Sequence, residues 1–197
     1  MKEIKVRLTF TEPLLGTSPA NPDIYREFIG SKAPDAATVE DEVEALGADA
    51  VAEKSMTVFP RNAQGVPLLY DYQIKGFFKD TCGGLRKVKG TESEKIKAYK
   101  KEIDKLIFVE PREIPLEFED NMTECQRPLR AQTPQGERVS LAMSEQVPAG
   151  AVCEFKVVCL SDTHEAAVRE WLDYGKWSGI GQWRNSGKGR FHWAEIE

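Results

Sequence analysis

The sequence predicts an α+β fold, in which an antiparallel sheet is backed by helices. Residues Lys2 to Phe10 alternate apolar and polar side chains, which is typical of a half-buried strand. The last 45 residues follow the order strand, helix, glycine-rich loop, strand. Apolar residues also recur at helical spacing over Ile74–Leu85 and Thr163–Tyr174, so these two segments are expected to cover one face of the sheet.

The first quarter of the chain contains an acidic insertion after the first strand. Thr11 to Pro22 holds three prolines and is predicted to be a loop. Short helices are expected over Asp23–Gly30 and from Thr38 to Gly47, and together they form a predicted acidic helical insertion over residues 21–55. Met56–Phe59 is a predicted short strand.

The middle of the chain is predicted to alternate strands and helices. Leu68–Tyr72 is expected to be extended, and the following helix over Ile74–Leu85 is weakened by Gly83 and Gly84. Glu92–Lys105 has the pattern of an amphipathic helix. Leu106–Phe118 is expected to be a strand region interrupted by Pro111 and Pro115.

The last third begins with a segment that is difficult to place in a compact core. Residues 119–150 are predicted to form a projecting loop or hairpin, because they are rich in proline and arginine and long for a connection. Val152–Leu160 then predicts a strand, and the Thr163–Tyr174 helix has Ser161, Asp162 or Thr163 as its N-terminal cap. Arg190–Ile196 predicts the closing strand. We expect residues 1–197 to form a single domain with these two additions.

Composition excludes several classes of protein. Hydrophobic residues make up 41% of the 197 residues, enough for a sizeable core. No stretch approaches the roughly 20 apolar residues of a membrane helix, and the N-terminus lacks the apolar block of a signal peptide, so a cytoplasmic protein is expected. The four cysteines form no C-x-x-C pair, and Cys153 and Cys159 should face one side of a strand. Buried thiols are therefore expected, with no metal site and no cofactor.

Charge is distributed unevenly along the chain. The net charge is −5, but residues 35–53 hold seven acidic and no basic side chains. Residues 75–101 hold nine basic and three acidic ones, and residues 175–193 hold four basic and no acidic ones. A chain that is acidic overall can still present a basic groove to a polyanion. The alternative is that these stretches are solvated faces with no ligand.

The glycine-rich loop is the most informative motif. Gly179, Gly181, Gly187 and Gly189 form two G-x-G pairs around a basic, aromatic centre that contains Trp183 and Arg184. Backbone N–H groups in such loops bind phosphate oxygens, and an exposed tryptophan offers a face for a nucleobase. The loop follows a helix and precedes a strand, and Gly187-Lys188 is followed by glycine, so neither the dinucleotide fingerprint nor the P-loop fits. Trp183 has two possible roles, as a core residue beneath the loop or as a stacking platform.

A C-terminal helix followed by a loop of G-x-G-x(5)-G-x-G form and a closing strand resembles the signature of the RAMP superfamily. Two further segments agree with the resemblance: residues 130–160, where an arginine-bearing stretch leads through Val-Pro-x-Gly to a strand, and residues 74–86, where a lysine and a glycine open a helix. Among the RAMP proteins, the backbone-subunit branch is the most similar. The resemblance covers about two thirds of the chain.

The resemblance implies a ferredoxin-like, RRM-like sheet and binding of RNA, or of single-stranded DNA, along that sheet. It implies stacking into oligomers or filaments along the strand, either among CRISPR effector subunits or as a strand-binding protein of a phage or mobile element. No membrane partner is expected. The candidate nucleic-acid-binding residues are Lys75, Lys79, Arg86, Arg127, Arg130, Arg138, Trp183, Arg184, Lys188 and Arg190.

Two other functions stay open. Some RAMP proteins cleave RNA with a histidine, and the two histidines are His164, expected to be exposed at a helix start, and His192, expected on the sheet surface. Other members use a loop aspartate, for which Asp23 and Asp35 are the candidates. We expect no catalytic residue, because no second group is evident beside either histidine. The second alternative is a structural or interaction protein, such as a virion component or a mimic of an effector subunit.

Overall fold

The computed structural model describes residues 1–20, 56–133 and 136–197, which form two compact units. Unit 1 consists of Met1–Leu14, Pro60–Asn121 and Val147–Glu197, and unit 2 consists of Leu15–Phe59 and Met122–Gln146. The helices predicted over Asp23–Gly30 and Thr38–Gly47 lie outside the described residues. Most of the segment predicted as a projecting loop or hairpin over residues 119–150 belongs to unit 2.

The central sheet of unit 1 is antiparallel. Its order is β11 (Phe191–Glu195), β1 (Lys2–Phe10), β10 (Val152–Cys159) and β6 (Ile107–Glu110). The alternation in the sequence sets the pairing, because the buried residues of β1 stand opposite the buried residues of β10: Ile4 opposite Val157, Val6 opposite Phe155 and Leu8 opposite Cys153. The prediction of an antiparallel sheet that contains these terminal segments is confirmed.

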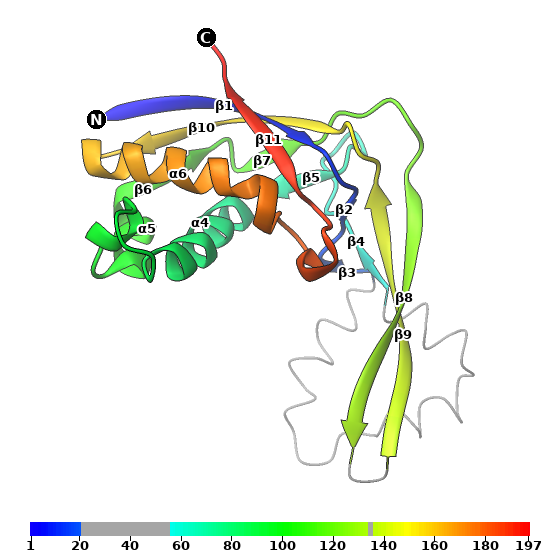
Figure 1. Cartoon of the computed structure of the whole chain (residues 1–197). Coiled ribbons are helices and arrows are strands. Elements are labelled where there is room, and N and C mark those ends of the chain that lie inside the picture. The colour runs from blue at the N-terminus through cyan, green and yellow to red at the C-terminus, as the bar shows by residue number, and fades with distance from the viewer. Residues whose placement is uncertain (21–55, 134–135) are drawn as a thin grey trace, which may run out of the picture. The chain divides into compact units, whose positions relative to one another are not determined.

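Three helices lie on one face of this sheet: α4 (Asp71–Leu85), α5 (Tyr99–Leu106) and α6 (Asp162–Ser178) (Figure 1). Rings from α4 and α6 form the centre of the core, where Phe78 lies 5.4 Å from Trp171, and Phe77 lies 5.3 Å from Phe191 between ring centroids. Ser161 caps α6 by accepting the backbone N–H of His164 at 3.3 Å. The α4 helix continues through the Gly83-Gly84 pair, so glycine does not end it.

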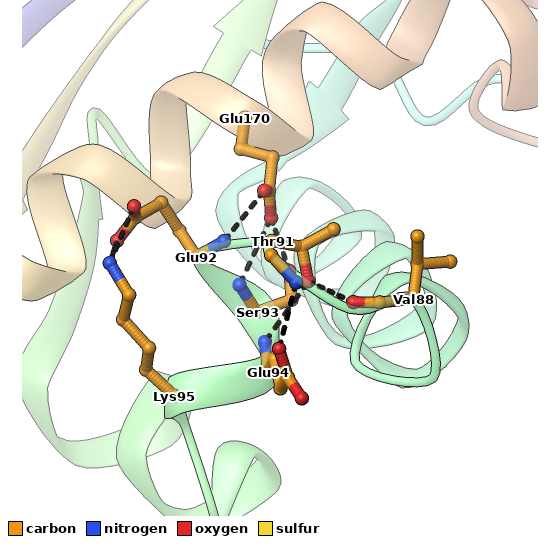
Figure 2. Close-up of polar contacts among 8 residues, drawn as sticks. Val88, Thr91, Glu92, Ser93, Glu94, Lys95 and Glu170 are labelled. Atoms are coloured by element: carbon orange, nitrogen blue, oxygen red, sulfur yellow. Dashed lines mark hydrogen bonds and ion pairs between the residues drawn. The ribbon is translucent and has the colours of Figure 1, made fainter.

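The segment predicted as one amphipathic helix over Glu92–Lys105 is broken in two. A 3-10 turn, η1 (Ser93–Lys95), is followed by extended backbone at Ile96, and α5 begins only at Tyr99. The reason is tertiary. The carboxylate of Glu170 on α6 accepts the backbone N–H groups of Glu92 (2.7 Å) and Ser93 (3.1 Å) and the Ser93 hydroxyl (2.6 Å), as Figure 2 shows. These bonds fix the chain in a conformation that a continuous helix does not provide.

A second, two-stranded sheet completes unit 1. In it, β5 (Leu68–Tyr70) pairs antiparallel with β7 (Glu113–Pro115). A cis peptide bond between Glu110 and Pro111 separates β6 from β7. The predicted interruption of this strand region is confirmed.

The segment predicted as a projecting loop or hairpin contains two long strands. β8 (Thr123–Thr133) pairs antiparallel with β9 (Gly136–Val147) from Thr123 opposite Gln146 to Thr133 opposite Gly136. β9 also belongs to a sheet with three two-residue strands: β2 (Leu14–Leu15), β3 (Ser18–Pro19) and β4 (Thr57–Val58). In the part of the chain that the structure describes, no helix is long and apolar enough to cross a membrane.

Candidate nucleic-acid interface

The glycine-rich loop joins α6 to β11 and takes a conformation that only glycine adopts easily. Gly179, Gly181, Gly187 and Gly189 all have positive φ angles of 63°, 86°, 89° and 68°. Trp183 is a positive-φ residue without being glycine, at 54°, and it directly precedes a 3-10 turn, η2 (Arg184–Ser186). The four glycines therefore let a short segment reverse its direction several times.

The two G-x-G pairs pack against each other rather than leaving an open cradle. Ile180 donates its N–H to the carbonyl of Gly189 at 2.9 Å, and Gly189 donates to the carbonyl of Pro13 at 2.9 Å. A Cβ atom at Gly179 would lie 2.5 Å from the carbonyl oxygen of Lys188. Gly179 and Gly189 thus allow the loop's own backbone to close at its base. The polar centre of the loop is held in place by this closure.

The centre of the loop faces a surface hollow of about 640 Å³ in unit 1, which we call the α4–loop hollow. Its cations are Lys79 and Lys87 from α4 and the turn after it, and Arg184 and Arg190 from the glycine-rich loop. Its aromatic residues are Tyr99, Tyr174 and Trp177, and the remaining lining residues are Asp80, Thr81, Gly83, Gly84, Ser178 and Asn185. The hollow therefore brings together the two basic stretches noted in the sequence.

Two of the predicted cations are held by neighbouring carboxylates. Arg184 Nη1 lies 2.6 Å from Asp80 Oδ2, and Lys79 Nζ lies 2.6 Å from Asp104 Oδ1. The hydrogen bond from Lys79 is the main cause of a lowered pKa at Asp104. Both pairs are exposed enough for water to screen them. The carboxylates therefore orient Arg184 and Lys79 without cancelling their positive charge.

Other predicted basic residues lie beside the hollow rather than lining it. Lys75 Nζ donates to the backbone carbonyl of Asp104 at 3.1 Å and lies 5.4 Å from the centroid of the Phe108 ring, while burial lowers the pKa of Lys75. The Arg86 guanidinium lies 5.2 Å from the ring centroid of Tyr99, which does line the hollow. Lys188 is half-buried in the glycine-rich loop.

The structure separates the two roles that the sequence left open for Trp183. Its side chain is 38% exposed, so it does not fill the core beneath the loop. Among the described residues that line the hollow, however, the tryptophan is Trp177, which is 62% exposed. Trp183 is thus on the surface next to Arg184, and Trp177 is the tryptophan that lines the hollow.

The arginines of the β8–β9 segment belong to unit 2. Arg127 is only 8% exposed, so most of its side chain lies in the interior of that unit. The backbone of Arg130 pairs with Val139, and that of Arg138 pairs with Ala131. The described side chains do not include those of Arg130 and Arg138, so their role in binding stays a prediction.

His164 was expected to be exposed at the start of a helix, but the prediction was wrong. The side chain is buried, with 6% exposure. Its Nδ1 lies 2.7 Å from Ser161 Oγ, and its Nε2 lies 3.2 Å from Glu102 Oε2 on α5. The exposure of His164 was predicted wrongly because the sequence does not show that α5 packs over the start of α6. His164 therefore connects α5 and α6, and its burial keeps it away from any nucleic acid bound at the surface.

Of the remaining catalytic candidates, the structure describes His192. His192 is exposed and stands opposite Thr9 of β1, on the sheet face away from the helices. Among the residues that the structure describes, no group of three or more His, Cys, Asp and Glu side chains is arranged to hold a metal ion. Asp23 and Asp35 lie outside the described residues.

The outer face of the sheet carries cross-strand ion pairs. Arg7 of β1 pairs with Glu154 of β10 through Nε–Oε1 at 2.6 Å. Lys156 lies 3.1 Å from a Glu110 carboxylate oxygen and 3.5 Å from one of Glu3. The resemblance implied binding along a sheet face, but two cations of this face, Arg7 and Lys156, are already paired with carboxylates. The α4–loop hollow has four cations and one carboxylate among its lining residues, which suits a polyanion better.

Sequence reasoning missed Lys87, Tyr99, Tyr174 and Trp177. One signal was present for the last two. The inward stripe of α6 runs through Val168, Trp171, Leu172 and Gly175, and Tyr174 and Trp177 lie off that stripe. Both are exposed and three positions apart on the helix, and a contiguous exposed apolar patch marks an interaction surface.

Comparison with known proteins shows a likeness in fold only. No family model matches the chain, and a search of curated proteins gives no match. A chain in the cryo-EM structure of the Type III-B Cmr-beta bound to cognate target RNA is similar, with a TM-score of 0.56 and 10% sequence identity. The similarity covers 99% of this chain and 59% of that chain, so the present chain spans about three fifths of its length. The chain thus has an α+β, ferredoxin-like fold that agrees at a coarse level with the RAMP resemblance.

Proposed function

We propose that this protein binds single-stranded nucleic acid, and RNA in preference to DNA, through the α4–loop hollow. The observation that carries the proposal is the convergence of four cations and three aromatic side chains from separate segments on one surface hollow. Cations bind backbone phosphates, and exposed rings stack on bases that are free of a partner strand. The fold supports the choice of RNA, because a chain of similar fold occurs in a complex bound to target RNA.

The strand is expected to lie across the hollow and the adjacent loop. Trp177 supplies the exposed ring in the hollow, while Trp183 supplies a second exposed ring beside Arg184. Lys79, Lys87 and Arg190 neutralise phosphates along this path. Lys75, Arg86 and Lys188 add charge beside it, and we assign them to the strand's outer contacts.

We further propose that several copies of the chain, or this chain and other effector subunits, assemble along one strand. The likeness to a chain of an RNA-bound complex supports this. We assign Arg130 and Arg138, and not the buried Arg127, to contacts with neighbouring subunits. Sedimentation of the protein with strands of 10, 20 and 40 nucleotides tests it. Complexes that grow with strand length are expected, and one copy per strand at every length contradicts the assembly.

The binding test uses labelled strands of one sequence as single-stranded RNA, single-stranded DNA and duplex. Fluorescence anisotropy should give tighter binding to the single strands than to the duplex, with RNA the tightest. Trp177→Ala should weaken RNA binding about 5- to 150-fold, because one stacking contact is lost. Its melting temperature should change little, since the side chain is 62% exposed.

Tyr72→Ala is the matched control, because Tyr72 is an exposed aromatic of α4 with 56% exposure that does not line the hollow. It should retain wild-type affinity. Equal binding of duplex and single strands, together with unchanged affinity in Trp177→Ala, would remove the hollow from the proposal.

A further inference from the structure

The four-stranded sheet of unit 1 has two edges, and the edge at β6 is covered. Its terminal strands are β6 and β11. Leu106, directly before β6, accepts the N–H of Leu160, so the alternate residues Ile107 and Val109 direct their backbone groups away from β10. Ile107 is 0% exposed and Val109 is 6% exposed. The chain itself therefore shields the backbone of this edge.

The edge at β11 is open. Ile196 donates its N–H to the carbonyl of Lys5, and in this register the even-numbered residues of β11 bond to β1. Trp193 and Glu195 therefore direct their N–H and C=O groups to the other side. Glu195 is exposed and Trp193 is half-buried. Within the described part of the chain, no strand pairs with β11 on that side.

This edge also lacks the features that usually prevent a sheet from pairing with another strand. Open edges in natural proteins commonly carry a proline, a lysine or a bulge. The sequence of β11 is Phe-His-Trp-Ala-Glu, which contains neither proline nor lysine. Its register with β1 is continuous from Val6 opposite Glu195 to Phe10 opposite Phe191, so it has no bulge. The edge is therefore suited to accept a further strand.

A second copy of β11 complements this edge when it runs antiparallel about a two-fold axis at Ala194. Trp193 then stands opposite Glu195 of the second copy, and these two residues exchange both N–H···O bonds. The two Ala194 residues face each other at the centre, where the Cα atoms of a non-hydrogen-bonded pair lie about 4.5 Å apart. Ala194 is exposed, and its small side chain permits this approach.

The side chains next to the axis select this register. The Arg169 guanidinium donates to both carboxylate oxygens of Glu195 at 2.9 and 3.2 Å and lies 5.9 Å from the ring centroid of Trp193. Trp193 of one copy thus meets a carboxylate that is already paired with a cation. A register centred on Glu195 would place two carboxylates opposite each other. Registers centred on Trp193 or His192 would use the backbone of Phe191, which is 0% exposed.

We propose that the open edge of β11 is a homodimer interface, through which two copies join their four-stranded sheets into one continuous antiparallel sheet. The partner is a second copy because one patch that complements itself is what a two-fold interface requires. This inference goes beyond nucleic-acid binding and does not rest on it. The dimer forms without nucleic acid, whereas the assembly proposed above needs a strand.

A cysteine at the two-fold axis tests the register. Cys125→Ala first removes the half-buried native thiol, since the other three native thiols are buried. In this background, Ala194→Cys should form a disulfide-linked dimer on mild oxidation with copper phenanthroline, because a Cα separation of about 4.5 Å lies within the range for a disulfide. A non-reducing gel measures the dimer.

Thr9→Cys in the same background is the matched control. Thr9 is exposed on the same sheet face as Ala194 but lies on β1, one strand further from the axis. Three strand spacings would separate the two β1 strands of the dimer by about 14 Å, which is too far for a disulfide. Thr9→Cys should therefore stay monomeric. Equal cross-linking of the two variants, or none in Ala194→Cys, would contradict the register.

Sedimentation velocity of the protein without nucleic acid, from about 1 to about 200 μM, measures the dimer directly. Glu195→Pro removes an N–H that points to the open edge and leaves the bonds to β1 in place. Its dissociation constant should be about 30-fold higher than that of wild type, because two hydrogen bonds are lost across the axis. Glu195→Gln is the matched control, since it removes the charge and keeps the N–H, and it should dimerise nearly as well as wild type.

Ala194→Lys provides a second variant that does not alter the backbone. Its side chain is exposed in the single copy, so the melting temperature should stay close to that of wild type. Two lysines would stand opposite each other at the axis, so the dimer should be lost. A wild-type protein that is monomeric at every concentration, or a dimer that survives both Glu195→Pro and Ala194→Lys, would overturn the proposal. Either result would leave the proposed function intact, because the α4–loop hollow does not include β11.

Discussion

At the scale of single residues, the ion pair between Arg184 and Asp80 bears directly on the proposed binding of a nucleic-acid strand. The pair joins the loop to α4 with an N–O distance of 2.6 Å, and both side chains are partly exposed. Exposed ion pairs are weak, because water screens them and both side chains lose freedom. If the proposed function holds, a phosphate of the bound nucleic acid replaces the Asp80 carboxylate at small cost, and Asp80 competes with the ligand for Arg184.

Asp80→Asn should strengthen single-strand binding about 1.5- to 5-fold, the range that corresponds to one exposed ion pair. Arg184→Ala should act in the opposite direction. Anisotropy titrations of both variants with the labelled RNA measure the effect. Glu113→Gln, which removes one exposed acidic group of β7, controls for the change in net charge and should bind as wild type. Weaker binding by Asp80→Asn would mean that Asp80 positions Arg184 for the ligand.

At the scale of elements, the side chains of β10 alternate between the two faces of the sheet. Cys153, Phe155, Val157 and Cys159 are buried against the helices, and the residues between them face outward, so the predicted buried thiols of this strand are confirmed. Burial raises the pKa of Cys153 to about 12 and that of Cys159 to about 12. The thiols of this strand are thus held in the protonated form.

The raised pKa of Cys153 predicts a loss of stability in alkali. In the unfolded chain this thiol ionises near its ordinary value of 9.0, whereas in the folded chain it stays protonated until about 12. The contribution of this thiol to the free energy of unfolding is therefore complete below pH 9 and is lost as the pH rises toward 12. Urea unfolding followed by tryptophan fluorescence reports on unit 1, since all four tryptophans lie there.

Cys153→Ala should lose less stability between pH 8.5 and pH 11 than the wild-type protein. Cys125→Ala, at a half-buried position in β8 of unit 2, is the control and should keep the wild-type pH dependence. If the free energy of unfolding falls with pH equally in wild type and Cys153→Ala, ionisation of this thiol does not cause the loss of stability in alkali.

At the scale of the whole molecule, charge is separated along the chain more than its net value suggests. The protein carries a net charge of −5, yet four cations from α4, the turn after it and the glycine-rich loop line one hollow. A local field of one sign can attract a polyanion against the overall charge. Binding driven by such a site depends on salt, because each neutralised phosphate releases counterions.

The salt dependence of RNA binding should therefore be steep. Four phosphate contacts to a single strand correspond to a slope of about −3 in a plot of log affinity against log salt concentration. Lys87→Gln should reduce the slope by about 0.7. Lys2→Gln, at an exposed lysine of β1 away from the hollow, should leave it unchanged. A slope near zero would remove the electrostatic part of the proposed function.

The local patterns of the sequence were sufficient for most helices and strands of unit 1. The alternation in Lys2–Phe10 and the apolar stripe of α6 predict which residues are buried, because a strand and a helix repeat their side-chain directions every two and 3.6 residues. The prediction over Glu92–Lys105 was wrong, because Glu170, 77 residues after Ser93 in the chain, binds the backbone there. The same limit explains the misplaced His164, whose partner Glu102 lies on another helix.

The sequence alone was enough to predict the α+β class, an antiparallel sheet that contains the first and last strands, the buried thiols of β10 and the basic character of α4 and the glycine-rich loop. The packing of the elements was needed to show that Lys79, Trp177 and Arg190 share one hollow and that Arg184 is held by Asp80. The physical reason is that periodicity reports on which side of its own element a residue lies. A binding site depends on distances between elements, and these are set by how the helices pack on the sheet.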